Sequence, residues 1–337
     1  MTDPMQTNPR HLTRREFLKI TAIPAGLLVA GRLIEASSRR SPRVFHETRL
    51  MMGTVINLTV LSTGGDEAGY AIRTTFAELE RLVSLFDHRR PSSPVATLNR
   101  QGRILQAPLE VADIIRRACT YSEISRGAFD ITIKPVLEAY QAGKKQPENL
   151  LGLVDYRRIR FSGNGISFDH PGMAITLDGI AKGRVIDGGA QVLRALGFEN
   201  IIVEAGGDLM ASGQRAGGDP WRVGVQHPRK SIAHPWLTTI QVQNQAIATS
   251  GDYMNSFTSD YRQHHIIDPR NGRSPTTYSS VTVLAQSATD ADALATTLML
   301  LGREEGPALV EQLPGVEALF VQKDLTTFRT SGFPKEA

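Results

Sequence analysis

The chain has 337 residues, of which 41% are hydrophobic and 21% charged, a balance that predicts a packed globular protein and excludes a largely disordered one. Its formal net charge of +4 resides in residues 1–42, which hold seven basic and three acidic side chains, so the remainder is balanced. We therefore expect no nucleic-acid partner. The single cysteine, Cys119, excludes an intrachain disulfide and a cysteine-cluster metal site.

Residues 1–42 have the pattern of an export signal. The run Thr13-Arg-Arg-Glu-Phe-Leu-Lys19 precedes an apolar stretch, 20–33, that is short for a membrane-spanning helix. Paired arginines before Phe-Leu resemble a twin-arginine (Tat) signal, and a basic tail with a short apolar helix is the alternative. The prediction is a periplasmic protein if the signal is cleaved near Ala36. If it is not cleaved, we expect a protein anchored at the outer face of the inner membrane.

Residues 43–337 are predicted to form one domain. In chain order, the apolar periodicity first predicts a strand over 45–61, a helix over 68–87, a loop over 88–100, a helix over 108–125 and an exposed connection over 141–152. Three short strands over 159–161, 165–168 and 174–177 follow, and then a helix over 182–196. The last part is predicted to hold strands over 201–204, 221–227, 237–242, 246–249, 264–267 and 280–285, a helix over 290–301, and two closing strands within 316–328. Runs of strands with interspersed helices predict an α+β fold with mixed or antiparallel sheets.

The predicted helix over 290–301 carries Asp292 and Thr296. A spacing of four residues places this carboxylate and this hydroxyl on one helical face. Two adjacent hard oxygen donors suit Mg²⁺, which takes few protein ligands and leaves its other positions to water and phosphate. This pair therefore predicts a magnesium site next to a phosphate-bearing ligand.

The segment 176–183, Thr-Leu-Asp-Gly-Ile-Ala-Lys-Gly, connects a predicted strand to a predicted helix. Its glycines allow a ligand to approach the backbone, and the N-terminus of a helix favours an anion. Lys182 could pair with a phosphate. Asp178 could bind the ligand or cap the helix, and an ordinary turn with a solvated lysine is the alternative. The Gly-Lys-Ser/Thr ending of a P-loop is absent.

Three further segments carry polar or aromatic groups. Glu204-Ala-Gly-Gly-Asp208 follows a hydrophobic strand and predicts a tight turn or a close approach to a ligand, and Gly127-Ala-Phe-Asp-Ile-Thr132 offers an aromatic ring that could stack on a ligand or pack in the core. Thr249-Ser-Gly-Asp-Tyr253 precedes His264 and His265, which lie before a predicted Asp268-Pro-Arg-Asn-Gly272 turn. Adjacent residues of a strand point to opposite faces, so at most one histidine should face a given site.

Seven motifs in this order resemble the ApbE family of FAD:protein FMN transferases. They are Met52-Gly-Thr, Gly127-Ala-Phe-Asp-Ile-Thr, Gly179-Ile-Ala-Lys-Gly, Ala205-Gly-Gly-Asp, Thr249-Ser-Gly-Asp-Tyr, His265-Ile-Ile-Asp-Pro and Ala291-Asp-Ala-Leu-Ala-Thr. The resemblance implies a T-fold-like α+β domain. It also implies an enzyme that binds FAD and Mg²⁺, splits the FAD pyrophosphate, attaches FMN through a phosphoester to a Thr or Ser hydroxyl of a partner protein, and releases AMP.

The resemblance also implies roles for particular residues. Mg²⁺ would be bound by Asp292, Thr296 and the backbone carbonyl near Gly179. The nucleotide would contact Met52, Phe86, Ala128, Phe129, Asp130, Thr176, Asp178, Lys182, Gly206, Gly207, Ser250, His265 and Ile267. The general base near the acceptor hydroxyl could be His265, Asp252 or Asp178.

In one segment the chain departs from the pattern of the family. Much of the family reads Asp-Leu-Gly-Gly-Ile-Ala-Lys-Gly, whereas this chain has Thr176 at the first position and Asp178 two residues later. A similar Thr-Leu-Asn/Asp-Gly-Ile-Ala pattern is found in a Tat-exported, NosX-like branch that includes accessory proteins of nitrous oxide reduction.

The partners that the resemblance implies are FAD and a flavin-accepting protein, a subunit of a membrane electron-transfer complex on the exported side. The uncleaved signal is the only predicted link to a membrane. Two other activities remain open. One is an FAD-binding carrier without transfer, and the other is a Mg²⁺-dependent FAD pyrophosphatase in which water replaces the protein hydroxyl.

Overall fold

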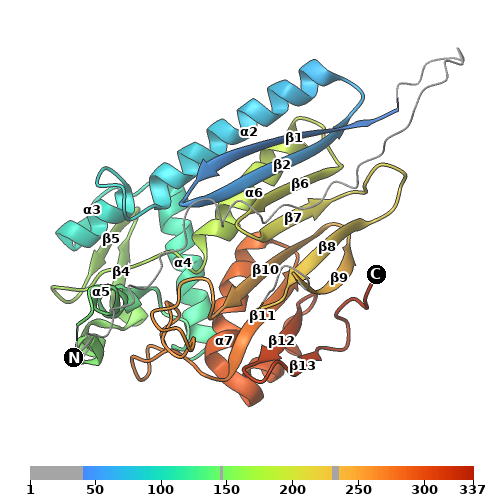
Figure 1. Cartoon of the computed structure of the whole chain (residues 1–337). Coiled ribbons are helices and arrows are strands. Elements are labelled where there is room, and N and C mark those ends of the chain that lie inside the picture. The colour runs from blue at the N-terminus through green and yellow to red at the C-terminus, as the bar shows by residue number, and fades with distance from the viewer. Residues whose placement is uncertain (1–40, 145–146, 230–234) are drawn as a thin grey trace, which may run out of the picture. The chain divides into compact units, whose positions relative to one another are not determined.

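The computed structural model describes residues 41–144, 147–229 and 235–337, drawn in colour in Figure 1. Arg40–Ala337 form one compact unit. Nearly all of the predicted export signal lies outside the described residues. Among the helices of the described part, none has the length and apolar character needed to cross a membrane.

The main sheet has eight strands, and every neighbouring pair is antiparallel, in the order β1-β2-β6-β7-β10-β11-β12-β13. Its strands are β1 (Arg43–Met51), β2 (Thr54–Ser62), β6 (Ile201–Ala205), β7 (Asp208–Ser212), β10 (Gln245–Gly251), β11 (Tyr278–Ala285), β12 (Glu317–Gln322) and β13 (Thr327–Arg329). A small sheet contains β3 (Arg103–Ile104), β4 (Ile159–Ser162) and β5 (Gly165–Phe168), and a separate hairpin contains β8 (Trp221–Gln226) and β9 (Trp236–Val242). The predicted α+β class with antiparallel sheets is confirmed.

The main sheet is covered on both faces (Figure 1). The α-helices are α2 (Gly65–Phe86), α3 (Pro94–Gln101), α4 (Leu109–Ile124), α5 (Lys134–Gln141), α6 (Ala181–Ala195) and α7 (Ala288–Val310), and the short 3-10 helices are η1 (Ile131–Ile133), η2 (Pro147–Leu153) and η3 (Tyr156–Arg158). Helices α2, α6 and α7 pack on one face, and hairpin β8–β9 packs on the other.

Alternation along the central strands builds two hydrophobic cores. In β7, Met210 belongs to the core under the helices, whereas Leu209 and Ala211 belong to the core under the hairpin. In β10, Ala246 and Ile247 divide in the same way. Because successive side chains of a strand point to opposite faces, a strand between two cores must be apolar on both. This arrangement holds the central strands rigidly, and the ends of those strands carry the candidate site.

Two tight turns join neighbouring strands of the main sheet, and the first of them differs from the predicted elements, whereas the second was predicted. The single strand predicted over 45–61 is a hairpin, because Met52 (φ 54°) and Gly53 (φ 71°) form the turn between β1 and β2. Gly206 (φ 59°) and Gly207 (φ 101°) form the matching turn between β6 and β7. Positive φ at both central residues is the requirement of the two-residue hairpin turn whose twist fits the strands.

Several other predicted elements are corrected by the structure. Residues 174–177 and 264–267 are not strands, and the predicted loop over 88–100 contains α3. Helix α5 and strand β7 have no counterpart in the predicted pattern. The start of α3 has an identifiable cause, because Ser93 caps it by accepting a hydrogen bond from Ala96 N (2.9 Å) and Pro94 fills its first turn.

The N-terminal turns of α6 and α7 are in backbone contact. A Cβ added at Gly183 would overlap the carbonyl oxygen of Ala288, so only glycine fits there. Asp187 of α6 accepts hydrogen bonds from the backbone N–H groups of Ala288 (2.8 Å) and Thr289 (2.9 Å) at the start of α7. Each helix therefore fixes the beginning of the other, and both helices pack against β7.

Candidate active site

Four oxygen-bearing residues meet where α7 passes the end of β10. Asp292 is 4% exposed, and its Oδ2 accepts a hydrogen bond from Gly183 N (2.9 Å). One turn later, Thr296 Oγ1 lies 3.0 Å from Ser250 Oγ. A Cβ built on Gly179 would lie 3.4 Å from the same Thr296 oxygen, so the backbone at residue 179 lies close to this hydroxyl. The three predicted metal ligands thus lie on two adjoining segments.

A second cluster, Lys182 and Asp208, adjoins this group. The Lys182 ammonium forms an ion pair with Asp208, which is 2% exposed and also accepts a hydrogen bond from Thr249 N (3.0 Å). Burial opposes the charged form of Lys182, but Asp208, Asp292 and Glu204 outweigh it and raise the pKa of the lysine. The lysine therefore carries a positive charge in the site at every physiological pH.

The environment of Asp292 favours its protonated form when no cation is bound. Burial is the largest cause and raises the pKa of Asp292 to about 7, with Asp208 adding to the effect and Lys182 and the Gly183 N–H opposing it. A carboxylate that is buried beside another carboxylate gains from a nearby cation. The electrostatics of this position thus suit a metal ligand.

His265 lies in the connection between β10 and β11. Its backbone N–H donates to Asn255 O (3.0 Å), and its buried Nδ1 has no hydrogen-bond partner among the described residues. Burial, then the neighbouring His264, lowers the pKa of His265 to about 4, with Asp178 opposing the shift. His265 is therefore a neutral imidazole near neutral pH, and its Nδ1 is a buried nitrogen without a partner among the described residues.

Asp178 is paired with an arginine and lines a small cavity. Arg89 holds both of its oxygens (3.0 and 2.8 Å), and the cavity, of about 210 Å³, is also lined by His88, Lys134 and Thr176. Burial would raise the pKa of Asp178, but Arg89 outweighs it and lowers the pKa. The hydroxyl of Thr176 accepts a hydrogen bond from Asp178 N (3.2 Å), so it stabilises this turn.

Asp252 is fully buried and bound by two cations. Arg229 donates to both of its oxygens (2.7 and 2.8 Å), and the Lys323 ammonium lies 2.5 Å from Oδ2. Both oxygens of this carboxylate are therefore occupied by hydrogen bonds from cationic groups and are not free to bind an acceptor hydroxyl. Of the three predicted bases, the geometry therefore favours His265.

The turns predicted to contact the nucleotide lie side by side at the end of the sheet. A Cβ on Gly206 would come within 2.6 Å of Thr54 Oγ1, which places the β6–β7 turn against the residue that follows the Met52-Gly53 turn. Thr54 Oγ1 is buried and lacks a hydrogen-bond partner among the described residues. Gly206 and Gly207 directly precede Asp208 of the Lys182–Asp208 pair, and the buried Thr54 hydroxyl lies against Gly206.

The structure places four of the predicted nucleotide contacts inside the protein. Phe86 (2% exposed) and Ala128 (0%) belong to the main core, and Ile267 packs with Val136 and Leu137 under α5. The side chain of Asp130 caps η1 by accepting from Thr132 N (2.8 Å), and it also accepts from Tyr156 N (2.8 Å). The side chains of these four residues therefore contact other residues of the same chain.

Phe129 is also buried, but it reaches the edge of the candidate metal site. Its ring lies edge-on to Tyr121, and a Cβ on Gly179 would approach its Cε2 to 3.2 Å. Phe129 thus forms the apolar wall beside Gly179. Among the described residues no group of three or more His, Cys, Asp or Glu side chains could hold a metal.

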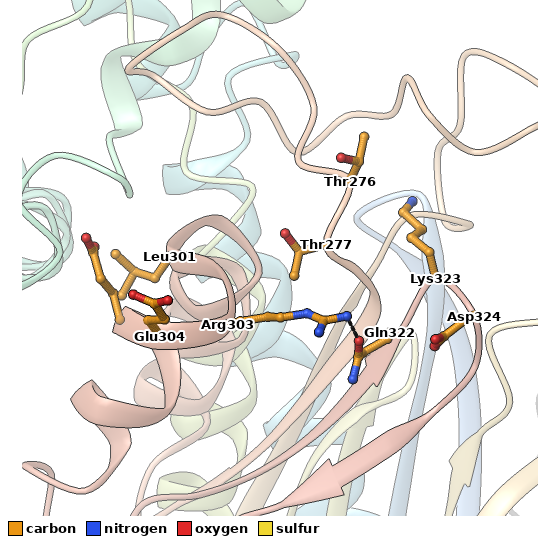
Figure 2. Close-up of a pocket in the computed structure, with 9 residues that line it drawn as sticks. Thr276, Thr277, Leu301, Arg303, Glu304, Gln322, Lys323 and Asp324 are labelled. Atoms are coloured by element: carbon orange, nitrogen blue, oxygen red, sulfur yellow. Dashed lines mark hydrogen bonds between the residues drawn. The ribbon is translucent and has the colours of Figure 1, made fainter.

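Figure 2 shows a larger cleft, of about 560 Å³, that none of the predicted site residues lines. It lies between the part of α7 around Gly302, where non-helical backbone (φ 77°) interrupts the helix, the segment before β11 and the turn after β12. Arg303 crosses its floor to Gln322, and Lys323 stands at its rim with its amine directed away from Arg303. The predicted site therefore does not coincide with this cleft.

The sequence pattern gave no role to two carboxylates, the buried Asp208 and the partly buried Asp187. Asp208 immediately follows the paired glycines and starts β7, and a carboxylate directly after a predicted tight turn was the available signal. Asp187 lies in the middle of α6 and caps a different helix. No local pattern reveals such a partner, because it lies 101 residues away in the chain.

Comparison with known proteins gives a consistent result. The model of the ApbE family matches residues 52–320. The chain is 28% identical to the FAD:protein FMN transferase of Vibrio cholerae, covering 90% of this chain and 96% of that one. It is 30% identical to proteins of the same name from Treponema pallidum, with 87% and 89% covered, and from Escherichia coli K12, with 93% and 95% covered.

Solved structures show the same architecture. The flavin transferase ApbE from Vibrio cholerae matches with a TM-score of 0.77 at 28% identity, covering 87% of this chain and 98% of that chain. The ApbE protein from Thermotoga maritima matches with a TM-score of 0.78 at 28% identity, covering 86% and 98%. The chain belongs to the ApbE family.

Proposed function

We propose that this chain is a Mg²⁺-dependent FAD:protein FMN transferase, which attaches FMN through a phosphoester to a Thr or Ser hydroxyl of a partner protein and releases AMP. The observation that carries the proposal is the meeting of Asp292, Thr296 and Gly179 with the Lys182–Asp208 pair at one end of the sheet. Family membership and the shared name of the full-length relatives support it.

The donor set fits Mg²⁺. Asp292 supplies a carboxylate, Thr296 a hydroxyl and Gly179 a backbone carbonyl, and all are hard oxygen ligands. The backbone of Gly179 lies close to the Thr296 oxygen, and the buried Asp292 lies in an environment that favours a bound cation. When bound, Mg²⁺ would neutralise charge on the FAD pyrophosphate and polarise its phosphorus–oxygen bonds.

The remaining chemistry belongs to residues of this chain. The acceptor hydroxyl oxygen forms a bond to the phosphorus of the FMN phosphate, and the bond from that phosphorus to the oxygen of the departing AMP breaks. His265 accepts the proton of the hydroxyl at Nδ1, which is free of other donors. Lys182 supplies a permanent positive charge that Asp208 holds in position.

Location and acceptor complete the proposal. Arg14 and Arg15 direct the folded protein through the Tat route, as in the NosX-like branch, to the periplasm or to the outer face of the inner membrane. The acceptor is then a flavin-carrying subunit of a membrane electron-transfer complex exposed on that side. Cell fractionation tests the route, since Arg14→Lys with Arg15→Lys should retain the protein in the cytoplasm.

One assay separates transfer from the alternatives. The purified protein is incubated with FAD, Mg²⁺ and purified flavin-carrying subunits of the organism's membrane electron-transfer complexes, and products are followed by mass spectrometry. An acceptor that gains the mass of FMN, with AMP released, supports the transferase. Free FMN with AMP and no modified acceptor identifies a pyrophosphatase, and intact FAD identifies a carrier. Either of these results contradicts the proposal.

A further inference from the structure

We propose that Asp252, Arg229 and Lys323, together called the Asp252 cluster, clamp the connection between β10 and β11 against the sheet and so position His265. Asp252 is then a positioning residue and not the general base. This inference rests on the proposed function for its effect on catalysis, but its structural part is independent of that function.

The position of Asp252 makes it an anchor for the connection. It directly follows Gly251, the last residue of β10, and its backbone N–H donates to Ser279 O (3.0 Å) on β11. Its side chain is fully buried and receives both nitrogens of the Arg229 fork as well as the Lys323 ammonium. A buried carboxylate with two cationic partners has little freedom to rotate.

Both cations contact the connection a second time, at Tyr261. The Arg229 guanidinium lies 4.1 Å from the centre of the Tyr261 ring, and Lys323 Nζ donates to the Tyr261 carbonyl oxygen (2.9 Å). Arg229 follows β8 and Lys323 follows β12, so the two groups reach the connection from different parts of the fold. Figure 2 shows Lys323 at the rim of the large cleft, with its amine directed out of the cleft.

Such an anchor is needed because the connection has almost no regular structure. Residues 252–277 contain no helix or extended strand and only isolated pairings such as Ser256 with His264. His265 lies in this segment, four residues after Tyr261, and its N–H bonds Asn255 O, three residues after Asp252. A loop with so few ladder hydrogen bonds depends on specific side-chain contacts to keep one conformation. Fixing Asp252 and Tyr261 therefore fixes the segment that bears His265.

The structural part is tested by amide hydrogen exchange on the substrate-free full chain. Asp252→Asn and Arg229→Gln should each speed exchange at the hydrogen-bonded amides of His265 and Phe257 by tenfold or more. The double variant should show no further increase, because both changes open the same clamp. Asp169→Asn, which removes an exposed ion pair with Arg160, is the matched control and should leave these amides unchanged.

The catalytic part is tested by FMN transfer to the acceptor found in the assay above. Positioning predicts that Arg229→Gln lowers kcat about as much as Asp252→Asn does, with the same shape of the pH–rate profile as the unaltered protein. Lys323→Met keeps the Arg229–Asp252 pair and should reduce kcat less. It also provides a folded variant if the others fail to fold.

Two results would overturn the inference. One is an unchanged exchange rate at His265 in Asp252→Asn and Arg229→Gln. The other is a pH–rate profile that loses its acidic limb in Asp252→Asn alone while Arg229→Gln stays active, which would identify Asp252 as the base. Absence of any FMN transfer by the unaltered protein would instead refute the proposed function, and the exchange experiment would still decide whether the clamp exists.

Discussion

Thr296 and Thr297 are neighbours on α7 with opposite surroundings. The hydroxyl of Thr296 faces Ser250 and the space beside Gly179, whereas Thr297 is fully buried and donates to Ala293 O (2.8 Å) within its own helix. Only one of the two can serve a ligand, although the residue type is the same. This contrast provides a matched pair of variants.

We expect Thr296→Val to raise the Mg²⁺ concentration needed for half-maximal FMN transfer about tenfold or more, because valine has the shape of threonine without the ligand oxygen. Thr297→Val is the control. It should lower stability slightly and leave the Mg²⁺ dependence unchanged. Activity is measured as a function of Mg²⁺ in metal-controlled buffer. Equal Mg²⁺ curves for Thr296→Val and the unaltered protein would contradict the ligand assignment.

The lowered pKa of His265 predicts that the protein loses stability in acid. Its pKa is lowered to about 4 in the folded protein, below the ordinary value of 6.5. The neutral form therefore stabilises the fold above about pH 6.5, and this contribution, on the order of 1 to 3 kcal/mol, is lost as the pH falls toward 4. Urea denaturation between pH 7 and 4 should show a smaller decrease for His265→Gln, which cannot be protonated. The same decrease in both proteins would be inconsistent with a buried neutral histidine.

At the scale of residues, the sequence indicates which chemical groups a motif contributes, but it does not indicate which distant residues will contact them in the fold. The helical spacing of Asp292 and Thr296 and the glycine before Lys182 are local, and the structure places them together. The Arg229 and Lys323 partners of Asp252 lie 23 and 71 residues away, so the buried ion cluster could not be read from the motif around Asp252. For the same reason, the motifs gave no ground for choosing the general base among Asp252, Asp178 and His265.

The contact between α6 and α7 is the junction on which the candidate site depends. Gly183 lets the two backbones touch and donates its N–H to Asp292. Because the obstacle to a side chain there is a backbone carbonyl, no side-chain rotation can make room for it. The elements that carry Lys182 and Asp292 are therefore held at a fixed separation.

Gly183→Ala should destabilise the protein by about 2 to 3 kcal/mol or more through overpacking, and it should also weaken Mg²⁺ binding by moving Asp292. Gly152→Ala is the control, since a Cβ there meets no atom within 4 Å, and its effect should stay within about 0.5 kcal/mol. Chemical denaturation measures both variants. A Gly183→Ala protein as stable as the control would show that the helices can separate without cost.

Asp187→Ala should lower the free energy of unfolding by about 1 to 2 kcal/mol, since two backbone N–H groups at the start of α7 lose their acceptor. Amide exchange should accelerate at Ala288 and Thr289 in particular. Acceleration spread evenly over the whole chain would argue against a capping role.

At the scale of elements, long periodic helices were predicted well and short elements poorly. The limits predicted for the helix over 68–87 differ from α2 by only a few residues, because its apolar stripe extends over the whole length. Strand β7 was missed because it begins directly after a turn and is buried on both faces, so it lacks the alternation of a half-exposed strand. The hairpin at Met52-Gly53 was missed because methionine is not a usual residue at positive φ.

For the molecule as a whole, ligand binding should appear as added stability. FAD and Mg²⁺ together, each at about 100 times its dissociation constant, should stabilise the fold by about 3 kcal/mol or more and raise the Tm by about 5 °C or more. Asp292→Ala should lose the part that depends on Mg²⁺. Differential scanning fluorimetry with and without Mg²⁺ measures both effects, and a Mg²⁺-dependent shift that persists in Asp292→Ala would place the ion elsewhere.

The positions of the site residues along the chain have a consequence for biosynthesis. Lys182 and Asp208 come from the middle of the chain, whereas Thr296 lies 41 residues before its last residue. The groups proposed to hold the nucleotide therefore cannot meet until α7 has been synthesised, and contacts between such distant residues form slowly. Nascent chains still on the ribosome should have no affinity for FAD, and a premature stop before α7 would yield a product unable to recognise its substrate.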